Sequence, residues 1–250
     1  MDSQLTCGAC RDSDSLAAGI TMAFQPIVDV AARTVFAHEA LVRGIHGEGA
    51  AEVLSGIDES NRYGFDQACR VRALECAKDA ALPALVSINF LPNAVYNPEH
   101  CLRATLAAAE RVNWPLTDII FEVTEHEEIT DHAHLLSILA AYRARGFKTA
   151  IDDFGAGYAG LNLLADFQPD LLKLDIGLIR NVHEDVVRQR IVKHMVRLCE
   201  EIGVRVIAEG VELAEEAKAL FDLGISLQQG FFFARPALAP LPDIRFISVP

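Results

Sequence analysis

The sequence predicts an α/β protein, a (β/α)8 TIM-type barrel in which one strand runs antiparallel to its neighbours. The prediction comes from eight short runs rich in β-branched and aromatic residues, from amphipathic helical stretches between most of them, and from a length of 250 residues. Strands that alternate with helices imply parallel crossover connections, and eight of them imply a closed barrel rather than an open sheet. A single barrel domain commonly has about this length.

The elements follow one another in a regular order. Residues 1–18 are small and polar, and we expect them to form a flexible segment ahead of one domain at residues 19–250. The predicted strands are residues 24–30, 35–41, 85–89, 119–123, 148–151, 171–174, 205–208 and 226–229. The predicted helices are residues 65–81, 98–112, 133–146, 185–203 and 212–223. The connection between the first two strands, at residues 29–34, is too short for a crossover, so these strands should form an antiparallel hairpin.

Composition and charge limit the kinds of partner. The formal net charge is −13, which argues against a partner that is a nucleic-acid polymer, because such a groove needs a basic stripe. A small ligand that contains phosphate remains possible, since local cations can outweigh the net charge. The sequence has no run of roughly 18 apolar residues and no basic and apolar leader, so we expect a cytoplasmic protein without a membrane segment.

The six cysteines do not suggest a disulfide framework. Four of them fall on helical patterns as small apolar residues, namely Cys69, Cys76, Cys101 and Cys199. Cys7 and Cys10 form a CxxC pair in the polar segment. A zinc site would need a second pair of ligands with similar spacing, and none follows, so a metal-free segment is favoured over a zinc or redox role.

Asp152 and Asp153 lie where an apolar run stops and a glycine-rich loop begins. Two adjacent carboxylates repel each other at neutral pH, and a divalent cation can offset that repulsion while both stay ionised. Taken alone, the pair is also compatible with one Asp capping a following helix and the other facing solvent. The residues at the other strand ends decide between these interpretations.

Polar side chains occur at nearly every predicted strand end, where TIM-type barrels carry their chemistry. They are Glu39 and Arg43, Asn89, Glu122 with Thr124 and Glu125, Asp152 and Asp153, Lys173 and Asp175, Glu209 with Glu212, and Gln229. Carboxylates that converge without partners repel strongly, so cations are needed. Oxygen ligands favour Mg²⁺ or Mn²⁺, whereas His38 and His126 occupy alternating positions that should face away from the mouth.

Two cations bridged by an Asp are a common arrangement for the hydrolysis of phosphodiesters. Lys173 would lie beside such cations and could orient a water molecule or stabilise negative charge. The alternative for Lys173 is a structural salt bridge to Asp175 or Glu212. Strand alternation places Asp175 on the same side as Lys173.

Seven segments, in order, resemble the signature motifs of EAL domains. They are Glu39-Ala-Leu41 with the following Val-Arg-Gly, Ser87-Ile-Asn-Phe-Leu-Pro92, Phe121-Glu-Val-Thr-Glu125, Ile151-Asp-Asp-Phe-Gly-Ala-Gly-Tyr158, Pro169-Asp-Leu-Leu-Lys-Leu-Asp175, Val206-Ile-Ala-Glu-Gly-Val-Glu212 and Gln229-Gly-Phe231. The resemblance covers about residues 20–240. EAL domains are bacterial phosphodiesterases that linearise cyclic di-GMP to pGpG, so the resemblance implies a hydrolase that lowers the level of this second messenger.

The resemblance also implies roles for individual residues. Glu39, Asn89, Glu122 and Asp152 would hold one divalent cation, Mg²⁺ or Mn²⁺. Asp152, Asp153 and, directly or through water, Glu209 would hold a second. Lys173 would contact the attacking water, Glu209 is the candidate general base, and Glu212 would support this arrangement. The nucleotide site would be lined by Gln25, Leu41, Arg43 and Gln229, with Arg43 pairing a phosphate.

The loop after the Asp pair has a regulatory role in this family, where it couples dimerisation to metal and substrate binding. Glu125 would anchor the loop, residues 154–161, which contains Phe154, Gly155 and Tyr158. The resemblance therefore implies a homodimer, and the apolar segment at residues 158–164 agrees with this, although it could equally pack within the monomer. The chain departs from the common motif at Ala156, Ala159 and Phe231, where Thr, Ser and Tyr are usual; the two alanines leave the loop's regulatory set-point open.

A second function also follows from the resemblance. EAL domains that have lost catalysis act as cyclic di-GMP receptors or protein-interaction modules. Such members typically lose the Glu of the EAL motif, an acid of the Asp pair, or the catalytic Lys or Glu, and this chain has all of them. The sequence therefore favours the active enzyme over the silent receptor.

Overall fold

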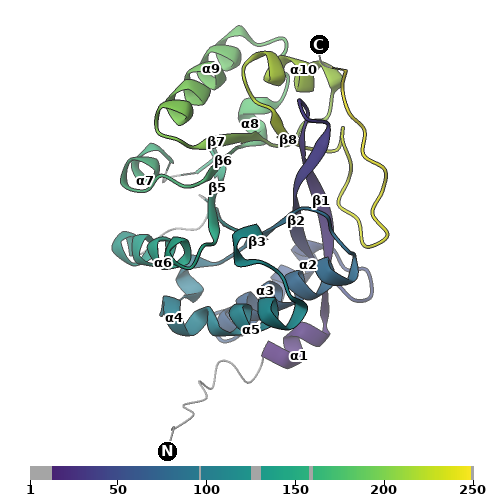
Figure 1. The fold of residues 1–250 in the computed structure, drawn as a ribbon, viewed down its shortest axis with the longest axis vertical. Coiled ribbons are helices and arrows are strands. Elements are labelled where there is room, and N and C mark those ends of the chain that lie inside the picture. Colours follow the sequence, from purple (N-terminus) through teal and green to yellow (C-terminus); the bar gives the residue numbers. More distant parts are fainter. Residues whose placement is uncertain (1–12, 96, 125–130, 158–159, 249–250) are drawn as a thin grey trace, which may run out of the picture.

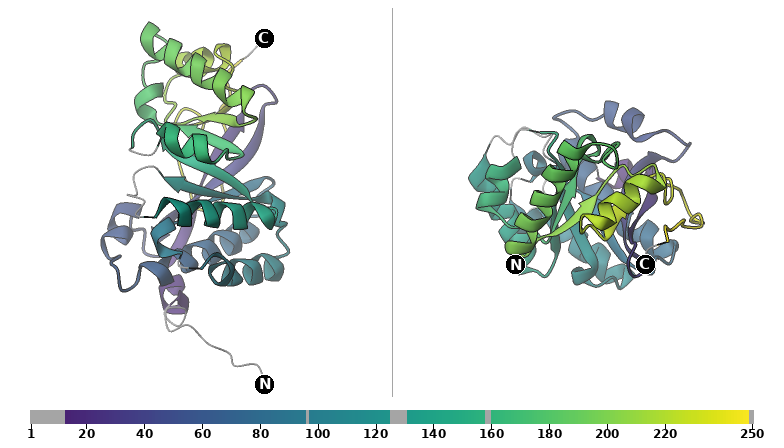
Figure 2. Two further views of the ribbon diagram at one scale, coloured as in Figure 1. Left: turned by 90° about the vertical axis from the view of Figure 1, so that its left-hand side faces the viewer. Right: turned by 90° about the horizontal axis from the view of Figure 1, so that it is seen from above.

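The computed structural model describes residues 13–95, 97–124, 131–157 and 160–248. Within these residues, eight strands close into a barrel in sequence order, and helices surround it (Figures 1 and 2). The predicted (β/α)8 barrel is confirmed. The sheet positions the polar side chains described below, because the strand ends meet at one rim.

The strands are β1 Ile20–Asp29, β2 Thr34–Gly44, β3 Leu85–Asn89, β4 Ile119–Thr124, β5 Lys148–Phe154, β6 Leu171–Leu174, β7 Arg205–Ala208 and β8 Leu227–Gln229. Strand β1 is antiparallel to both of its neighbours, β2 and β8, and the remaining pairs are parallel. The β1–β2 hairpin turns where the Asp29 carboxylate accepts the N–H groups of Ala31 and Ala32, each at 3.1 Å. The expected hairpin is therefore present, and β1 is the reversed strand.

The helices are α1 Ser13–Ala18, α2 Ala50–Ser55, α3 Arg62–Asp79, α4 Pro98–Cys101, α5 Arg103–Val112, α6 His132–Ala144, α7 Gly160–Asp166, α8 Ile176–Ile179, α9 Val186–Glu201 and α10 Ala214–Asp222, with 3₁₀ turns η2 Pro92–Ala94 and η3 Leu116–Asp118. From the sequence we expect residues 1–18 to be flexible. In the structure, residues 13–18 form α1, which contacts α3. Residues 1–12, which include Cys7 and Cys10, lie outside the described residues. The helix expected at residues 98–112 is divided into α4 and α5. None of the helices in the described ranges is long and apolar enough to cross a bilayer.

The barrel interior has an apolar layer beneath a polar one. The apolar layer consists of buried residues from seven strands: Ile27, Ala37, Ile120, Ala150, Leu171, Ile207 and Leu227. Because side chains of one strand face the same way at every second residue, the next inward positions toward the carboxyl ends are polar. Glu39 follows Ala37, Glu122 follows Ile120, and Lys173 follows Leu171 in this way. A larger apolar core fills the space between the barrel and its helices.

Candidate active site

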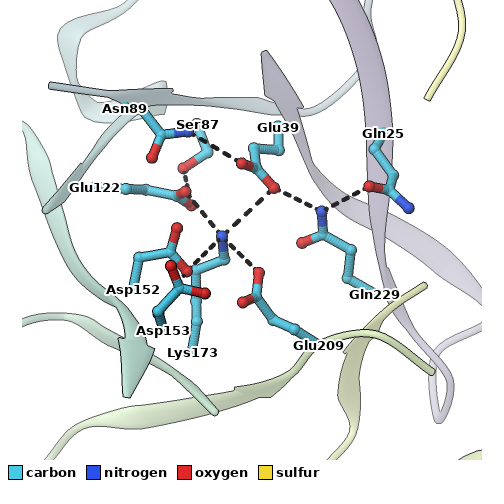
Figure 3. A network of polar contacts seen from close by, with 10 residues as sticks. All are labelled: Gln25, Glu39, Ser87, Asn89, Glu122, Asp152, Asp153, Lys173, Glu209 and Gln229. Atoms are coloured by element: carbon cyan, nitrogen blue, oxygen red, sulfur yellow. Dashed lines mark hydrogen bonds and ion pairs between the residues drawn. The ribbon is translucent and has the colours of Figure 1, made fainter. Parts of the chain in front are cut away.

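The amino group of Lys173 lies at the centre of four carboxylates (Figure 3). Its Nζ atom is 2.6 Å from Glu209 Oε1, 2.8 Å from Glu122 Oε2, 3.0 Å from Asp152 Oδ1 and 3.4 Å from Glu39 Oε2. The Lys173 side chain is fully buried. The sequence placed Lys173 among these strand ends but did not predict that it would contact all four acids. One ammonium group can offset only one of these negative charges.

The pKa values reflect this excess of carboxylates. Burial is the largest cause that raises the pKa of Glu122, to about 8; Lys173 opposes the shift, and the neighbouring Glu39 and Asp152 add to it. Burial likewise raises the pKa of Glu209 well above its ordinary value. Burial alone would lower the pKa of Lys173, but the surrounding carboxylates raise it well above its usual range. The cluster would therefore be stabilised by additional positive charge.

Two groups of carboxylates in this cluster have the spacing of a metal site. Glu39, Glu122 and Asp152 form one group, and Asp152, Asp153 and Glu209 form the other; within each group one ligand oxygen per residue lies within 4.8 Å of the others. Asp152 belongs to both. These donors are all carboxylate oxygens, which suit hard cations such as Mg²⁺ and Mn²⁺.

Asp153 joins the cluster through an irregularity of strand β5. Adjacent residues of a regular strand face opposite sides, so Asp152 and Asp153 could not both face the barrel mouth. The register between β5 and β6 shifts between Ile151 and Phe154, and Asp153 has a left-handed backbone with φ 55°. The Asp153 N–H donates to Asp152 Oδ1 at 2.9 Å. This bulge places both carboxylates at the rim.

Amide side chains hold Glu39. Asn89 Nδ2 donates to Glu39 Oε1 at 3.0 Å, and Gln229 Nε2 donates to Glu39 Oε2 at 2.6 Å. Gln229 Nε2 also lies 3.3 Å from Gln25 Oε1. The Oε1 atom of Gln229 is buried and has no hydrogen-bond partner within the described part of the chain. The predicted residues Asn89, Gln25 and Gln229 thus lie together with Glu39 (Figure 3).

Ser87 is a further residue of the site that the sequence analysis missed. Its Oγ atom donates a hydrogen bond to Glu122 Oε1, and its side chain is fully buried. Ser87 precedes Asn89 by two residues on β3, so it faces the barrel interior on the same side. This inward position within the strand was a signal that could have identified it.

Glu209 lies directly after β7, where the backbone turns sharply. Its N–H donates to Leu174 O at 3.2 Å. The next residue, Gly210, has φ 67°, and a Cβ atom there would lie 2.5 Å from Ile176 Cγ1. Only glycine fits this turn, which keeps the Glu209 carboxylate against Lys173.

Glu212 lies at the edge of the mouth rather than in the central cluster. Arg180 donates two hydrogen bonds to it, to Oε2 and, at 2.7 Å, to Oε1. The hydrogen bond from Arg180 lowers the pKa of Glu212. The sequence left open a salt bridge from Lys173 to Asp175 or Glu212, and Lys173 instead contacts Glu39, Glu122, Asp152 and Glu209. Asp175 accepts the N–H of Gly177 at 2.7 Å and caps α8.

A cavity of about 300 Å³ opens above the cluster. It is lined by Gln25, Glu39, Leu41, Asp152, Asp153, Asp175, Ile176, Glu209, Gly210, Glu212, Gln229, Gly230 and Phe231. Three of the four predicted nucleotide contacts are among them. The fourth, Arg43, is not; its Nη1 atom donates to Val42 O at 2.7 Å, and its role with a phosphate stays a prediction. Phe231 is exposed, and the Arg235 guanidinium lies 4.1 Å from the centre of its ring.

The loop predicted at residues 154–161 lies partly outside the described residues. Phe154 is buried at the end of β5, and Gly155 has φ 102°. Glu125 and Tyr158, like Ala159 and His126, lie outside the described residues. The segment at residues 158–164 was expected to be an apolar loop, but from Gly160 it belongs to helix α7. In that helix Leu163 and Leu164 are buried, and Leu161 is exposed.

The chain belongs to the EAL domain family, whose match covers residues 13–236. Among curated relatives, the chain is 33% identical to the blue light- and temperature-regulated antirepressor BluF of Escherichia coli over 96% of this chain and 60% of BluF. It is 32% identical to the cyclic di-GMP phosphodiesterase PdeR of the same organism, over 70% of this chain and 26% of PdeR. The chain therefore spans less than two thirds of the length of BluF and about a quarter of the length of PdeR.

Solved structures show the same fold. A standalone versatile EAL protein from Vibrio cholerae, in its c-di-GMP-bound form, is 50% identical with a TM-score of 0.88, over 90% of this chain and 95% of that one. BlrP1 from Klebsiella pneumoniae, in complex with manganese and cyclic di-GMP, is 38% identical with a TM-score of 0.86, over 91% of this chain and 58% of that one.

Proposed function

We propose that the chain is a metal-dependent phosphodiesterase that hydrolyses cyclic di-GMP to linear pGpG and so lowers the level of this second messenger. The observation that carries the proposal is the ring of four carboxylates around Lys173, which together with Asp153 forms two groups with metal-site spacing that share Asp152. Relatives named as cyclic di-GMP phosphodiesterases and neighbours solved with cyclic di-GMP support the choice of substrate.

The ligand assignment follows the two groups. Glu39, Asn89, Glu122 and Asp152 would hold one divalent cation, and Asp152, Asp153 and Glu209 would hold the other. When bound, the cations supply Lewis acidity at the phosphate and lower the pKa of a water molecule. Mg²⁺ and Mn²⁺ both accept such oxygen ligands, and a manganese complex of BlrP1 is among the structural neighbours.

The protein's own residues supply the remaining functions. Lys173 holds the four carboxylates in fixed positions, and its ammonium group can orient the attacking water through a hydrogen bond. Glu209 is the candidate general base because it lines the cavity and contacts Lys173. Glu212, held by Arg180, supports the edge of the mouth beside Glu209.

The substrate would lie across the cavity. Gln25, Leu41 and Gln229 line it, and the buried Oε1 atom of Gln229 offers an acceptor without a protein partner in the described residues. Arg43 would reach a phosphate from β2 by a change of rotamer. Because the chain carries a formal net charge of −13, bound cations would also offset the repulsion of an anionic nucleotide.

The second candidate is a catalytically silent cyclic di-GMP receptor or protein-interaction module. One observation favours it: the relative BluF is named an antirepressor. Lys173 also provides one positive charge to the carboxylates without any metal. The complete set of acids, together with Lys173, favours the enzyme.

A homodimer and a cytoplasmic location complete the proposal. The exposed side chain of Leu161 on α7, within the segment that couples dimerisation in this family, supports the dimer. Light scattering after size exclusion would give the mass of one chain, 27.3 kDa, if the protein is a monomer, and twice that mass if the proposal is right.

The test of function is a product assay. Purified protein is incubated with cyclic di-GMP and Mn²⁺ or Mg²⁺, and the nucleotides are separated by chromatography. We expect pGpG from the wild type and no turnover from Glu39→Ala, Asp152→Ala or Glu209→Ala. The matched control is Glu215→Ala, which removes an exposed acid of α10 and should keep full turnover. Cyclic di-GMP binding without pGpG would identify a receptor instead.

A further inference from the structure

Helix α3 carries a buried ion pair behind the metal-binding edge of the barrel. Arg70 Nη2 lies 2.7 Å from Asp66 Oδ2, one helical turn away, and both side chains are almost completely excluded from solvent. Neither residue lines the cavity above Lys173. The proposed reaction gives this pair no role.

Arg70 packs against the residues next to two proposed metal ligands. Its guanidinium carbon lies 5.5 Å from the centre of the Phe90 ring and 5.3 Å from that of Phe121. Phe90 follows Asn89 on the chain, and Phe121 precedes Glu122. Since adjacent residues of a strand face opposite sides, Arg70 supports the outer face of β3 and β4 where their inner face presents the ligands.

Backbone contacts connect the same three segments. Asp66 Oδ1 accepts the N–H of Leu91 at 3.0 Å, and the N–H of Phe90 donates to Glu122 O at 3.0 Å. The chain just after Asn89 is therefore held by α3 on one side and by β4 on the other. Tyr142 of α6 completes the arrangement, because its hydroxyl lies 2.7 Å from Arg70 Nη1.

Stability alone does not explain a pair of this kind. A buried ion pair can often be replaced by apolar residues of similar volume with no loss of stability, because the desolvation of both charges offsets their attraction. What an apolar pair cannot reproduce is the acceptor for the Leu91 N–H and the planar contact with both rings.

We infer that Asp66 and Arg70 are positioning residues that hold Asn89 and Glu122 at the separation a divalent cation requires. The inference rests on the proposed function, because it concerns the cation that Glu39, Asn89, Glu122 and Asp152 would share. Supporting partners of this kind typically change metal affinity by about 10- to 100-fold.

The experiment measures the affinity for Mn²⁺ alone by calorimetry on metal-depleted protein, together with stability in denaturant. The double variant Asp66→Leu/Arg70→Met should stay folded with a lower denaturant midpoint, because the Leu91 N–H loses its acceptor, and should bind Mn²⁺ at least tenfold more weakly. Arg70→Lys keeps a buried cation for Asp66 but loses the planar contact, and it should also weaken Mn²⁺ binding about tenfold. Arg72→Lys is the matched control: Arg72 lies on the same helix but pairs with Glu75 at 2.9 Å, outside the Arg70 contacts, and its replacement should change affinity less than threefold.

The outcomes separate the two claims. Wild-type affinity in a folded Arg70→Lys variant, or in the folded double variant, would overturn the positioning role and leave the phosphodiesterase proposal standing. A wild type that binds no Mn²⁺ and forms no pGpG would overturn both. If the double variant does not fold, Arg70→Lys still decides the matter.

Discussion

Replacing Lys173 with Met removes the ammonium group that contacts all four carboxylates and keeps a side chain of similar volume. The lysine is fully buried, and its Nζ atom lies between 2.6 and 3.4 Å from the four acids. In Lys173→Met the acids of the cluster that are ionised at neutral pH would face one another without a counter-charge. In metal-free protein at neutral pH, we therefore expect a large loss of folding stability.

The magnitude follows from the burial of the cluster. Removing one partner of a buried ion pair typically costs about 3–5 kcal/mol. For a domain of this size, about 1 kcal/mol corresponds to a change of roughly 2–4 °C in melting temperature, so the midpoint should fall by about 6–20 °C. Turnover should fall by about 10²- to 10³-fold, the usual effect of removing a group that stabilises charge in an active site.

The assay is denaturant and thermal unfolding in the presence of a chelator, followed by the product assay in Mn²⁺. Lys148→Met is the control, since it removes a half-buried lysine at the opposite end of β5 and should change stability by less than about 1 kcal/mol. A Lys173→Met variant with the stability of the wild type would show that Lys173 does not offset the carboxylate charge, and would refute the electrostatic reasoning.

Three further predictions concern other residues. Asparagine adopts the left-handed backbone of position 153, with φ 55°, at little cost, so the Asp153→Asn variant should fold like the wild type but bind Mn²⁺ more weakly. Unchanged Mn²⁺ affinity in calorimetry would exclude Asp153 as a ligand. Burial raises the pKa of Tyr142 to about 12 from 10.0, so the stability that its neutral hydroxyl contributes is present below pH 10 and is lost as the pH rises through about 12. Absorbance at the phenolate band should show a late-titrating tyrosine that is absent from Tyr142→Phe, and a Tyr142→Phe variant with the titration curve of the wild type would contradict this. Burial raises the pKa of Cys199 to about 11, so Cys199 should resist a thiol reagent until the protein unfolds; rapid labelling of Cys199 in native protein would disagree with the structure.

The fold was largely predictable because its signals are local and repeated. Runs of β-branched residues, the helical periodicity between them and the short connection at residues 29–34 were sufficient for the barrel and its reversed strand. The short helices α2, α7 and α8 were not predicted, since helices of four to seven residues depend on caps and packing rather than on periodicity. The Asp175 cap of α8 is one such contact.

The site was predictable where alternation along a strand determines which way a residue faces. Glu39, Glu122 and Lys173 follow inward apolar residues at a spacing of two, so their convergence could be expected. Asp153 could not be placed in this way, because it faces the mouth through a bulge that no local sequence pattern indicates. The contacts of Lys173 with all four acids depend on the closure of the barrel, which brings together residues from β2, β4, β5, β6 and the segment after β7.

The central claim is that cations bound at Asp152 and its neighbours drive hydrolysis. The most direct test measures turnover while Mn²⁺ is added back to metal-depleted protein. Protein depleted with a chelator is titrated with Mn²⁺, while pGpG formation and bound manganese are measured on the same samples. The account predicts no turnover at the start and a rate that stops rising when two Mn²⁺ are bound per chain. Full turnover in chelated protein, or none at full occupancy, would contradict it.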